Sequence, residues 1–435
     1  MNKTITKIAL IALAGLLIIN GCKKETNTIS AAAVTAALTT TAVTSINTST
    51  AQSGGNITSD GGNAIISRGV CWSTTTGPTT ANSKTTDGAG NGLFTSALTG
   101  LTGGTTYYVK AYGTNSAGTT YGNEISFTTP VDKDVYVAGV EYNGTQRVGK
   151  VWKNGVATSL TTGTTNSEGN SVFVLGTDVY VAGMEENSSS VKVAKIWKNG
   201  VATSLTNGLN PARATSVYVS GTDVYIAGTE FNGVSNVAKV WKNGVATSIT
   251  NGSFTANAYS VFVSGNDVYV SGREFNGTRD VAKVWKNGVA TSLTSSPFGG
   301  LANSVYVLGT DVYVAGTKSS SGNNIATFWK NGVETVLSNG TNDAQALSVF
   351  ASGSDVYIAG YDGNDAKLWK NGVATILPGT NSGTASSVYI SGTDVYVAGY
   401  QSNGTQSIVK VWKNGVASLL TNSLNFAYAQ SIFIK

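Results

Sequence analysis

Short hydrophobic runs separated by turn-forming residues recur at a regular spacing from Asp134 to the end of this chain. Each copy has the order D-V-Y-V-A-G, a variable stretch, A-K-V-W-K-N-G-V-A-T-S-L, a second variable stretch and S-V-Y-V-S-G, with local substitutions. The spacing is 44 or 45 residues over most of the array, and a repeat of roughly 40 to 50 residues with four strand-like segments is typical of a β-propeller. The copies are marked by Asp134, Asp178, Asp223, Asp267, Asp311, Asp355 and Asp394, and by Trp152, Trp197, Trp241, Trp285, Trp329, Trp369 and Trp412.

The third copy illustrates how one repeat folds into four antiparallel strands. Residues 216–220 and 224–227 are hydrophobic on both faces, as expected of inner strands that neighbouring sheets cover on both sides. A Gly-Thr-Asp turn joins these two strands, and the strand that contains Trp241 follows. The next dipeptide is Asn-Gly, which predicts a tight hairpin because both turn positions need a positive φ. Residues 245–249 then form the outer strand.

The two ends of the array complement each other. The array begins at Asp134 with the second strand of a repeat, and residues 431–435 are the first strand of another. We therefore expect the C-terminal segment to pair with the first repeat, which closes a ring of seven blades and leaves no unpaired strand edge at the seam.

Residues 34–130 lack this repeat and predict a separate domain. Short alternating strands over about 100 residues are typical of a β-sandwich. The strand-like runs are 65–72, 92–98, 105–114 and 121–128, and the predicted turns between strands include Ser53-Gly54-Gly55, Asp60-Gly61-Gly62 and Asp87-Gly88.

One part of this domain resembles a fibronectin type III domain. The resemblance lies in L-T-G-L at 98–101, T-Y-Y-V-K-A-Y at 106–112 and N-S-A-G at 115–118. It implies that Leu101 and Tyr107 form a corner that pins two strands, and that the domain is a spacer or an adhesive module. Trp72 would be a core aromatic, although it comes later than the early tryptophan of that family. The predicted fold is therefore all-β, a small sandwich followed by a seven-bladed propeller.

The N-terminus has the features of a secretory signal. Lys3 and Lys7 precede the apolar run 8–19, which is too short to span a bilayer of ~30 Å as a helix. The end of this segment, I-N-G-C, resembles the lipobox of bacterial lipoproteins, which implies cleavage after residue 21 and lipidation of Cys22. An ordinary secreted protein with a chance cysteine is the alternative.

Residues 22–33 form a polar, then alanine-rich, flexible tether. It begins with K-K-E after the cysteine, which resembles the short export signals of some surface lipoproteins. We expect a protein held in the outer membrane by the lipid on Cys22 and facing outward, with the periplasmic leaflet as the alternative.

Composition excludes several functional classes. The chain has no histidine, which rules out Ser-His-Asp and Cys-His nucleophiles and histidine-based metal sites. The net charge of +5 is spread without a basic run, so a nucleic-acid partner is not expected. Cys71 has no histidine or basic cluster nearby to form a thiolate, so we expect a packed core residue. We predict no catalytic residue, no metal and no cofactor.

The two longer connections of each repeat vary freely, whereas the two short turns hardly change. In an up-and-down blade the longer connections share one face, and a ligand site would be built there. Carboxylates and aromatic rings on such a rim could bind a sugar or a protein partner, or could be solvated loop residues. An acid pair for glycoside cleavage needs a separation of ~5 to 9 Å, and equivalent positions on a ring would lie farther apart. The candidate rim residues are Glu141, Tyr142, Glu185, Arg213, Glu230, Phe231, Glu274, Phe275, Tyr361, Asp362 and Tyr400.

The opposite face carries one lysine beside each Asn-Gly turn and one aspartate before each Val-Tyr. We expect the lysines to provide solubility and edge protection, with an anionic envelope surface as an alternative partner. The aspartates are expected to accept turn hydrogen bonds. Together the sequence predicts a non-catalytic envelope lipoprotein that presents its propeller to a glycan or a protein. A polysaccharide hydrolase or lyase and a purely structural surface component are the alternatives.

Overall fold

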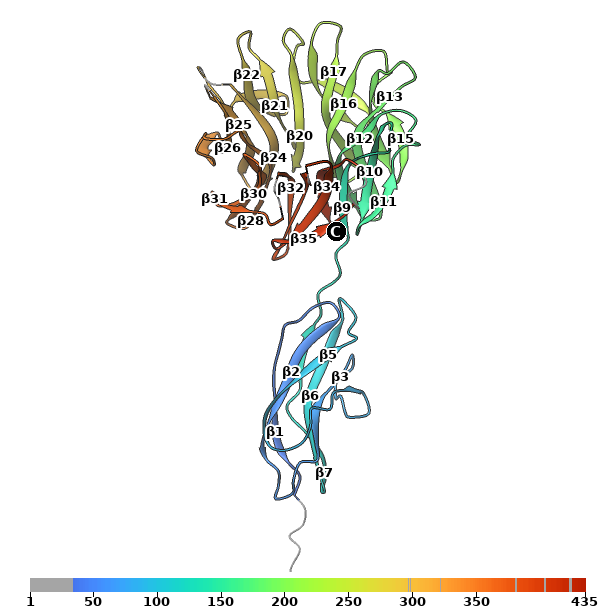
Figure 1. Cartoon of the computed structure of the whole chain (residues 1–435), viewed down its shortest axis with the longest axis vertical. Helices are drawn as coiled ribbons and strands as arrows, with labels where there is room; N and C mark the ends of the chain where they lie inside the picture. Colours follow the sequence, from blue (N-terminus) through green and yellow to red (C-terminus); the bar gives the residue numbers. More distant parts are fainter. Residues whose placement is uncertain are drawn as a thin grey trace, which may run out of the picture. The chain divides into compact units, whose positions relative to one another are not determined.

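The computed structural model describes residues 34–435 except 296, 298, 321, 380, 381, 403 and 422–424. The described residues form 36 strands and no helix, so they include no helix long and apolar enough to cross a membrane. They divide into two compact units between Asp132 and Lys133 (Figure 1). The expected signal peptide, the tether and Cys22 lie outside the described residues, and they stay predictions.

The first unit consists of two antiparallel sheets with a hydrophobic core between them. Ile57 and Leu98 enter this core from one sheet, and Val70 and Val109 enter it from the other. One sheet contains β1 (Ala37–Thr44), β2 (Thr50–Ser59) and β5 (Gly92–Thr99). The other contains β3 (Ser67–Ser73), β4 (Ser83–Lys84), β6 (Thr106–Asn115), β7 (Gly118–Tyr121) and β8 (Ile125–Thr128).

The residues expected to form a corner in this unit are buried together. Leu101 and Tyr107 are 6% and 7% exposed, and the Thr102 N–H donates to the Tyr107 hydroxyl at 2.9 Å. Trp72 belongs to the same core. The hydrogen bond ties the start of β6 to the segment after β5, and this joins the two sheets at one end.

One predicted turn of this unit is wrong. Ser53-Gly54-Gly55 lies inside β2 and pairs with both β1 and β5. The glycines are there because neighbouring backbone and rings come very close. A Cβ on Gly54 would lie 2.0 Å from the Phe94 carbonyl oxygen, and one on Gly55 would lie 2.6 Å from the Ala111 Cβ. Glycine in a strand therefore marks close packing here rather than a chain reversal.

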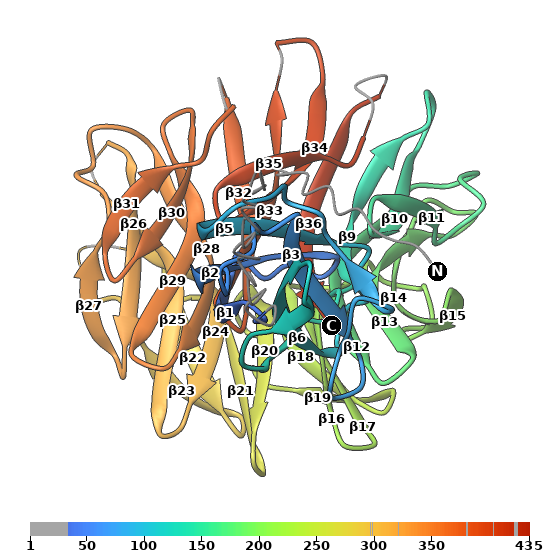
Figure 2. The same cartoon turned by 90° about the horizontal axis from the view of Figure 1, so that it is seen from below.

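The second unit contains seven four-stranded antiparallel sheets, out of nine sheets in the described chain. We number them by the order of their outer strands. Sheet 1 is β36-β9-β10-β11, and sheets 2 to 7 each take four consecutive strands from β12 to β35. Each inner strand contacts the inner strands of both neighbouring sheets, including β36 with β32 and β12. The sheets therefore stand around a central axis in a propeller-like arrangement (Figure 2).

The strand bounds follow the repeat closely. The inner strands are β12 (Ser167–Leu175), β16 (Ala212–Ser220), β20 (Ala256–Ser264), β24 (Gly300–Leu308), β28 (Ala344–Ser352), β32 (Gly383–Ser391) and β36 (Ala427–Ile434). The second strands are β9 (Val135–Tyr142), β13 (Asp178–Glu186), β17 (Asp223–Phe231), β21 (Asp267–Phe275), β25 (Asp311–Ser319), β29 (Asp355–Asp362) and β33 (Asp394–Ser402). The third strands are β10 (Arg147–Lys153), β14 (Lys192–Lys198), β18 (Asn236–Lys242), β22 (Asp280–Lys286), β26 (Asn324–Lys330), β30 (Asp365–Lys370) and β34 (Ser407–Lys413). The outer strands are β11 (Val156–Ser159), β15 (Val201–Ser204), β19 (Val245–Ser248), β23 (Val289–Ser292), β27 (Val333–Val336), β31 (Val373–Ile376) and β35 (Val416–Leu419).

The C-terminal strand pairs with the first repeat, as the sequence predicts. β36 runs antiparallel to β9, with Ile434 opposite Val135. Asp134 and Lys435 exchange two backbone hydrogen bonds of 3.0 Å at the end of this ladder. β36 thus supplies the inner strand that is missing from the first repeat.

The predicted Asn-Gly hairpins are confirmed by the backbone angles. Asn243 and Gly244 have φ values of 50° and 84°, and the equivalent pair of every other sheet is likewise positive at both positions. The turn between inner and second strands begins with a glycine such as Gly221, at φ 58°. Both geometries match the right-handed twist of the strands that they join.

The inner strands begin earlier than the sequence predicts, because each contains a β-bulge. In sheet 3 the register shifts between Ala214 and Ser216, so β16 continues back to Ala212. The bulge pushes a backbone carbonyl toward the second strand, where the glycine of D-V-Y-V-A-G lies opposite. A Cβ on Gly228 would lie 2.1 Å from the Arg213 carbonyl oxygen and 2.9 Å from the Trp241 ring. The bulged residues are Asn170, Thr215, Tyr259, Asn303, Leu347, Ser386 and Gln430.

Serine hydroxyls join the inner strands of successive sheets into a closed cycle. Each inner strand is the edge of its own sheet, so its backbone N–H groups on the axial side lack a ladder partner. In every sheet one of these N–H groups donates to a serine of the preceding sheet at 3.1 to 3.3 Å. The pairs, donor first, are Val172–Ser431, Val217–Ser171, Val261–Ser216, Val305–Ser260, Val349–Ser304, Val388–Ser348 and Ile432–Ser387.

Two further sets of aromatic residues pack the sheets together. Seven rings around the axis contact one another in a closed cycle, with centroids 4.5 to 5.0 Å apart. Each repeat tryptophan is buried against the preceding sheet, as Trp241 is against Tyr180 and Ala182. The axial rings are Phe173, Tyr218, Phe262, Tyr306, Phe350, Tyr389 and Phe433.

We predict that Ser260→Ala lowers the free energy of unfolding by about 1 to 3 kcal/mol, because the N–H of buried Val305 loses its acceptor. Ser264→Ala, at the end of the same strand, is the matched control and should change stability much less. Chemical denaturation of both variants measures the difference. Equal losses would show that the serine bond adds nothing to the closure of the ring.

Candidate functional site

The candidate rim residues lie at strand ends rather than in loops, which corrects the sequence-based placement. The ladder between β17 and β18 continues to Glu230 opposite Val237 and Phe231 opposite Asn236. Arg213 lies within β16 for the same reason, because the bulge extends the inner strand. The side chains are therefore held by paired backbone, which positions them more rigidly than a loop would.

The four rim glutamates are ion-paired with lysines of the same sheet. The pairs are Glu141–Lys150 at 3.2 Å, and Glu185–Lys195, Glu230–Lys239 and Glu274–Lys283 at 2.5 Å. Each pair is diagonal across the second and third strands, and both side chains are about one-fifth exposed. Each pair places a hydrogen-bond acceptor and a hydrogen-bond donor side by side at the rim.

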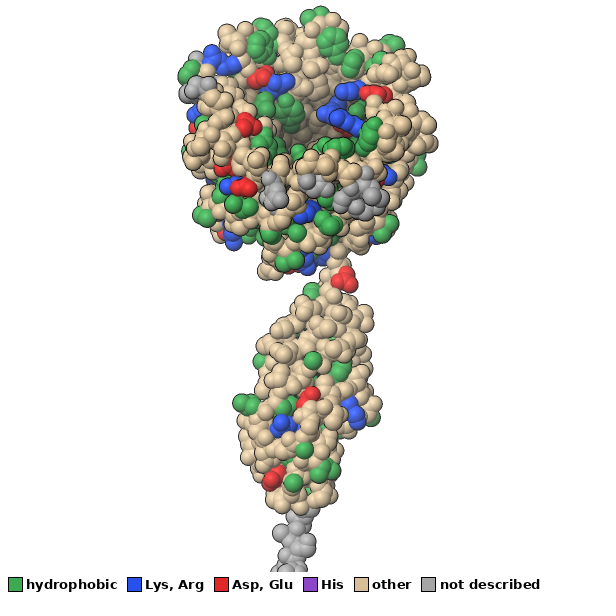
Figure 3. Space-filling model, in the orientation of Figure 1, with side chains coloured by type: hydrophobic (Ala, Val, Ile, Leu, Met, Phe, Trp, Pro, Cys, Tyr) green, Lys and Arg blue, Asp and Glu red, His purple; other side chains and the backbone are tan. Residues whose placement is uncertain are grey.

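Two of these ion pairs form the floor of polar pockets, which we call the rim pockets. The pocket of sheet 3 measures about 520 Å³ and contains Glu230, Lys239 and Ser248. The pocket of sheet 2 measures about 380 Å³ and is lined by the equivalent Glu185 and Lys195. Uncharged polar groups and backbone cover most of this unit's surface in Figure 3, with acidic and basic atoms side by side in several places.

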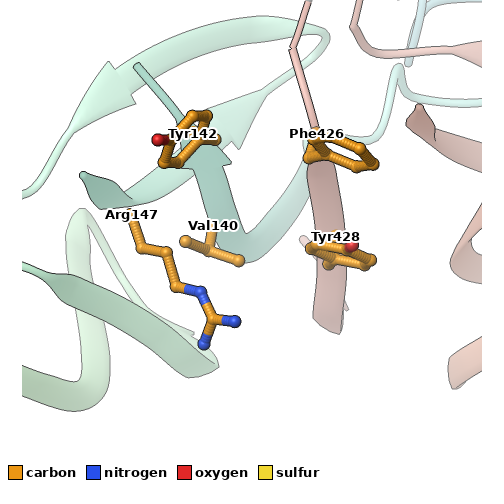
Figure 4. A pocket seen from close by; sticks show the side chains of 5 residues that line it. All are labelled: Val140, Tyr142, Arg147, Phe426 and Tyr428. Atoms are coloured by element: carbon orange, nitrogen blue, oxygen red, sulfur yellow. The ribbon is translucent and has the colours of Figure 1, made fainter. Parts of the chain in front are cut away.

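A third pocket, which we call the seam pocket, lies where the C-terminal strand joins sheet 1 (Figure 4). It measures about 410 Å³ and is lined by Val140, Tyr142, Arg147, Phe426 and Tyr428. Figure 4 shows the rings of Phe426, directly before β36, and Tyr428, within it, with Tyr142 at the end of β9 and Arg147 at the start of β10. Three aromatic rings and one guanidinium thus face the same open space.

The guanidinium of the seam pocket is held by a carboxylate that the sequence analysis did not identify. Glu168 is 7% exposed and bonds to Arg147 Nη1 at 3.3 Å and to the guanidinium of Arg213. The three residues come from sheets 1, 2 and 3 in order. Burial lowers the pKa of Arg213 from its usual range. Glu168 was missed because the inner strand was predicted to begin after it, at the S-V-F-V segment.

The remaining candidates make separate contacts rather than one shared site. Tyr400 packs edge-on against Tyr428 of the seam pocket, with ring centroids 4.8 Å apart. Tyr361 donates to Asp343 at 3.1 Å, and burial is the main cause of its raised pKa. Asp362 is paired with Lys367 at 3.8 Å. Phe231 lines the pocket of sheet 3, and Phe275 contacts Phe254 with centroids 6.2 Å apart.

The opposite face carries a repeated cluster in which the lysine charge is already neutralised. In sheet 3 Lys242 binds Asp223 at 2.8 Å and lies 5.2 Å from the Tyr225 ring centroid. Asn243 donates to the other Asp223 oxygen at 2.8 Å and accepts from the Val224 N–H. The aspartate therefore does accept a turn hydrogen bond, but from the Asn-Gly turn of the neighbouring hairpin. Each of these lysines is therefore paired with an aspartate of its own sheet.

Nothing in the described residues suggests a thiol or metal centre. Cys71 is fully buried, and desolvation raises the pKa of its thiol to about 11, which keeps it protonated at neutral pH. Residues 34–435, with the gaps given above, contain no group of three acidic or cysteine side chains placed to hold a metal ion.

No known protein family and no curated protein matches the sequence of this chain. Three solved structures are distantly similar. TolB from Acinetobacter baumannii has a TM-score of 0.41 at 11% identity, over 62% of this chain and 74% of TolB. A puromycin-hydrolysing peptidase from Mycobacterium tuberculosis has a TM-score of 0.47 at 10% identity, over 73% of this chain and 52% of the peptidase. A DUF4784 family protein from Bacteroides caccae has a TM-score of 0.29 at 11% identity, over 91% of this chain and 98% of that protein. Likenesses this distant carry no functional argument, so the description rests on the strand pairing of the chain itself.

We predict that the protein loses stability as the pH falls below about 4. Hydrogen bonds from Lys242 and Lys286 are the main cause of the lowered pKa of Asp223 and Asp267, and the pKa of the other five repeat aspartates is lowered too. The unfolded chain, with aspartates near ~3.9, takes up protons at higher pH than the folded protein does, so acid favours unfolding.

Melting temperatures between pH 5 and pH 2 measure this effect. Replacing Asp223 and Asp267 by Asn should flatten the pH dependence while the Asn-Gly turns remain. An unchanged pH dependence in the double variant would contradict a role for these carboxylates in acid stability.

Proposed function

We propose that this protein is a non-catalytic, glycan-binding lipoprotein of the bacterial outer membrane. In this proposal the first unit is a fibronectin type III-like spacer and the second is a seven-bladed β-propeller that carries the binding sites. The Leu101–Tyr107 corner supports the first assignment. The seven four-stranded sheets, the paired C-terminal strand and the cyclic contacts of the inner strands support the second.

The observation that carries the binding function is the pairing of the rim carboxylates with lysines inside open polar pockets. A paired glutamate and lysine present fixed acceptors and donors at the same place, and hydrogen bonds to charged groups are worth about 1.5 to 3 kcal/mol. Sugar hydroxyls need such a mixture of donors and acceptors.

The seam pocket supports the same class of ligand by a different contact. Tyr142 and Phe426 are 36% and 44% exposed, although large aromatic side chains are normally covered. Exposed rings around a concave site bind the apolar faces of sugar rings, and Arg147 adds hydrogen-bond donors that Glu168 holds in place.

The lipid anchor of the proposal is tested at Cys22. Growth of a Gram-negative host with labelled fatty acid should label the protein and carry it into the detergent phase. Cys22→Ser should abolish the labelling, because the thiol is the acceptor. Cys71→Ser is the matched control and should stay labelled, since Cys71 is buried in the first unit. Labelling that survives Cys22→Ser would overturn the anchor.

Glycan binding is tested with the Cys22→Ser chain on an array of neutral and acidic oligosaccharides. We expect binding to at least one class of glycan and no release of reducing ends from polysaccharides. Glu230→Gln and Glu274→Gln serve as controls for turnover. Sugar release that either substitution abolishes would replace the binding function by catalysis, and an array without any binding would refute the proposal.

A further inference from the structure

Three side chains recur together in sheets 1 to 4 and form what we call the Glu–Lys–Ser cluster. The glutamate is near the end of the second strand, the lysine is on the third strand, and the serine ends the outer strand directly opposite the lysine. The clusters are Glu141, Lys150 and Ser159; Glu185, Lys195 and Ser204; Glu230, Lys239 and Ser248; and Glu274, Lys283 and Ser292.

The cluster is absent from sheets 5 to 7, where the same three positions have changed. The serine is replaced in all three sheets by a hydrophobic residue: Val336, Ile376 and Leu419 are 53%, 53% and 60% exposed. Aliphatic side chains that are more than half exposed gain little from burial, so packing is a weak explanation of the exchange. The corresponding sets are Lys318, Thr327 and Val336; Asp362, Lys367 and Ile376; and Gln401, Lys410 and Leu419.

An ion pair alone does not require the serine. Sheet 6 keeps an acid and a lysine, Asp362 and Lys367, beside Ile376. In sheets 1 to 4, by contrast, the full pair is always accompanied by the hydroxyl, and Lys150 Nζ donates to Ser159 Oγ at 3.0 Å. The serine therefore occurs in the sheets that have both the glutamate and the lysine, which indicates a role beyond holding the strands together.

The pockets of sheets 2 and 3 enclose this cluster with equivalent surroundings. Each is also lined by the asparagine that caps the connection between the second and third strands, by a valine of the third strand, and by a Thr-Asn pair after the outer strand. The equivalent residues are Asn187, Val193, Thr206 and Asn207 in sheet 2, and Asn232, Val237, Thr250 and Asn251 in sheet 3. The two pockets thus share these polar groups, and differ in that Glu186 lines the first where Phe231 lines the second.

We infer that the protein is multivalent, with one site for a neutral sugar residue on each of sheets 1 to 4 and none of this kind on sheets 5 to 7. The inference rests on the proposed glycan-binding function and specifies it. The ion pair has no net charge, so it favours a neutral pyranose over a uronate or a sulfated sugar. The glutamate accepts from adjacent hydroxyls, and the lysine and serine donate to ring or hydroxyl oxygens.

Multivalency explains why one chain would carry several shallow sites. A single open polar pocket of this size holds a sugar weakly, because much of the ligand stays in water. Sites on one rigid rim act together on a polysaccharide, and linked binding can raise the overall affinity by about 10² to 10⁴.

The test is the binding stoichiometry of the Cys22→Ser chain with a monovalent glycoside of the type that the array identifies. Titration calorimetry should give four rim sites per chain, counted as those that remain when Tyr142→Ala with Phe426→Ala removes the seam pocket, and a repetitive polysaccharide of that sugar should bind at least a hundredfold more tightly. Glu230→Gln with Ser248→Ala should lower the stoichiometry to three. Ile376→Ala, at the serine position of sheet 6, is the matched control and should leave it at four.

Ser248→Ala alone tests the site without affecting the fold, because it removes one exposed hydroxyl. It should weaken one of the four sites at least tenfold without a change in melting temperature. A stoichiometry of one that Tyr142→Ala and Phe426→Ala abolish would overturn the inference and leave the proposed function intact, with the seam pocket as the site. Four sites that survive all four Glu→Gln substitutions would overturn it as well. Absence of binding to every glycan would refute both.

Discussion

The hydrogen bond from an inner-strand N–H to a serine of the preceding sheet is the interaction on which the second unit depends. The inner strand of each sheet has one edge without a ladder partner, and its N–H groups there need acceptors from outside the sheet. Seven serine bonds link these edges in a cycle, and the bond between Val172 and Ser431 includes the C-terminal strand. The ring of aromatic contacts follows the same strands and also closes through Phe433. The short segment S-V-Y-V-S thus supplies both the hydrogen bonds that close the cycle of sheets and the aromatic rings that pack around the axis.

The β-bulge separates a constant half of each sheet from a variable half. On one side of the bulge, the paired turns and the Asp–Asn–Lys–Tyr clusters are nearly identical in all sheets, because each residue satisfies a particular backbone or charged partner. On the other side the inner strands carry different residues, such as Glu168, Arg213 and Tyr428. The glycine opposite the bulge is required in every sheet because no Cβ fits beside the displaced carbonyl group. Residues can therefore change on one side of the bulge while the scaffold on the other side stays the same.

The chemistry available to each charged rim residue depends on its ion-pair partner. A glutamate alone on a rim could be an acid, a base, a metal ligand or a solvated side chain. With a lysine at 2.5 Å it becomes a fixed pair of acceptor and donor with no net charge. Hydroxyl and amide groups lie beside such pairs in the pockets of sheets 2 and 3. The seam pocket adds aromatic surface, so polar and stacking contacts are available on the same unit.

The sequence by itself determined the period, the strand order within each repeat, both kinds of tight turn and the pairing of the last strand, because these depend on local backbone preference and on hydrophobic alternation. The resemblance to a fibronectin type III domain implied that Tyr107 and Trp72 lie in a core, and both do. Only the tertiary structure decided the rest. Glycines 54 and 55 lie within a strand because of packing from another sheet, and the bulge moved Arg213 and Glu168 into the ladder. The ion pairs, the serine cycle and the seam pocket join residues from different strands or from opposite ends of the array, and such contacts depend on strand register and on the packing of side chains, which no local pattern encodes.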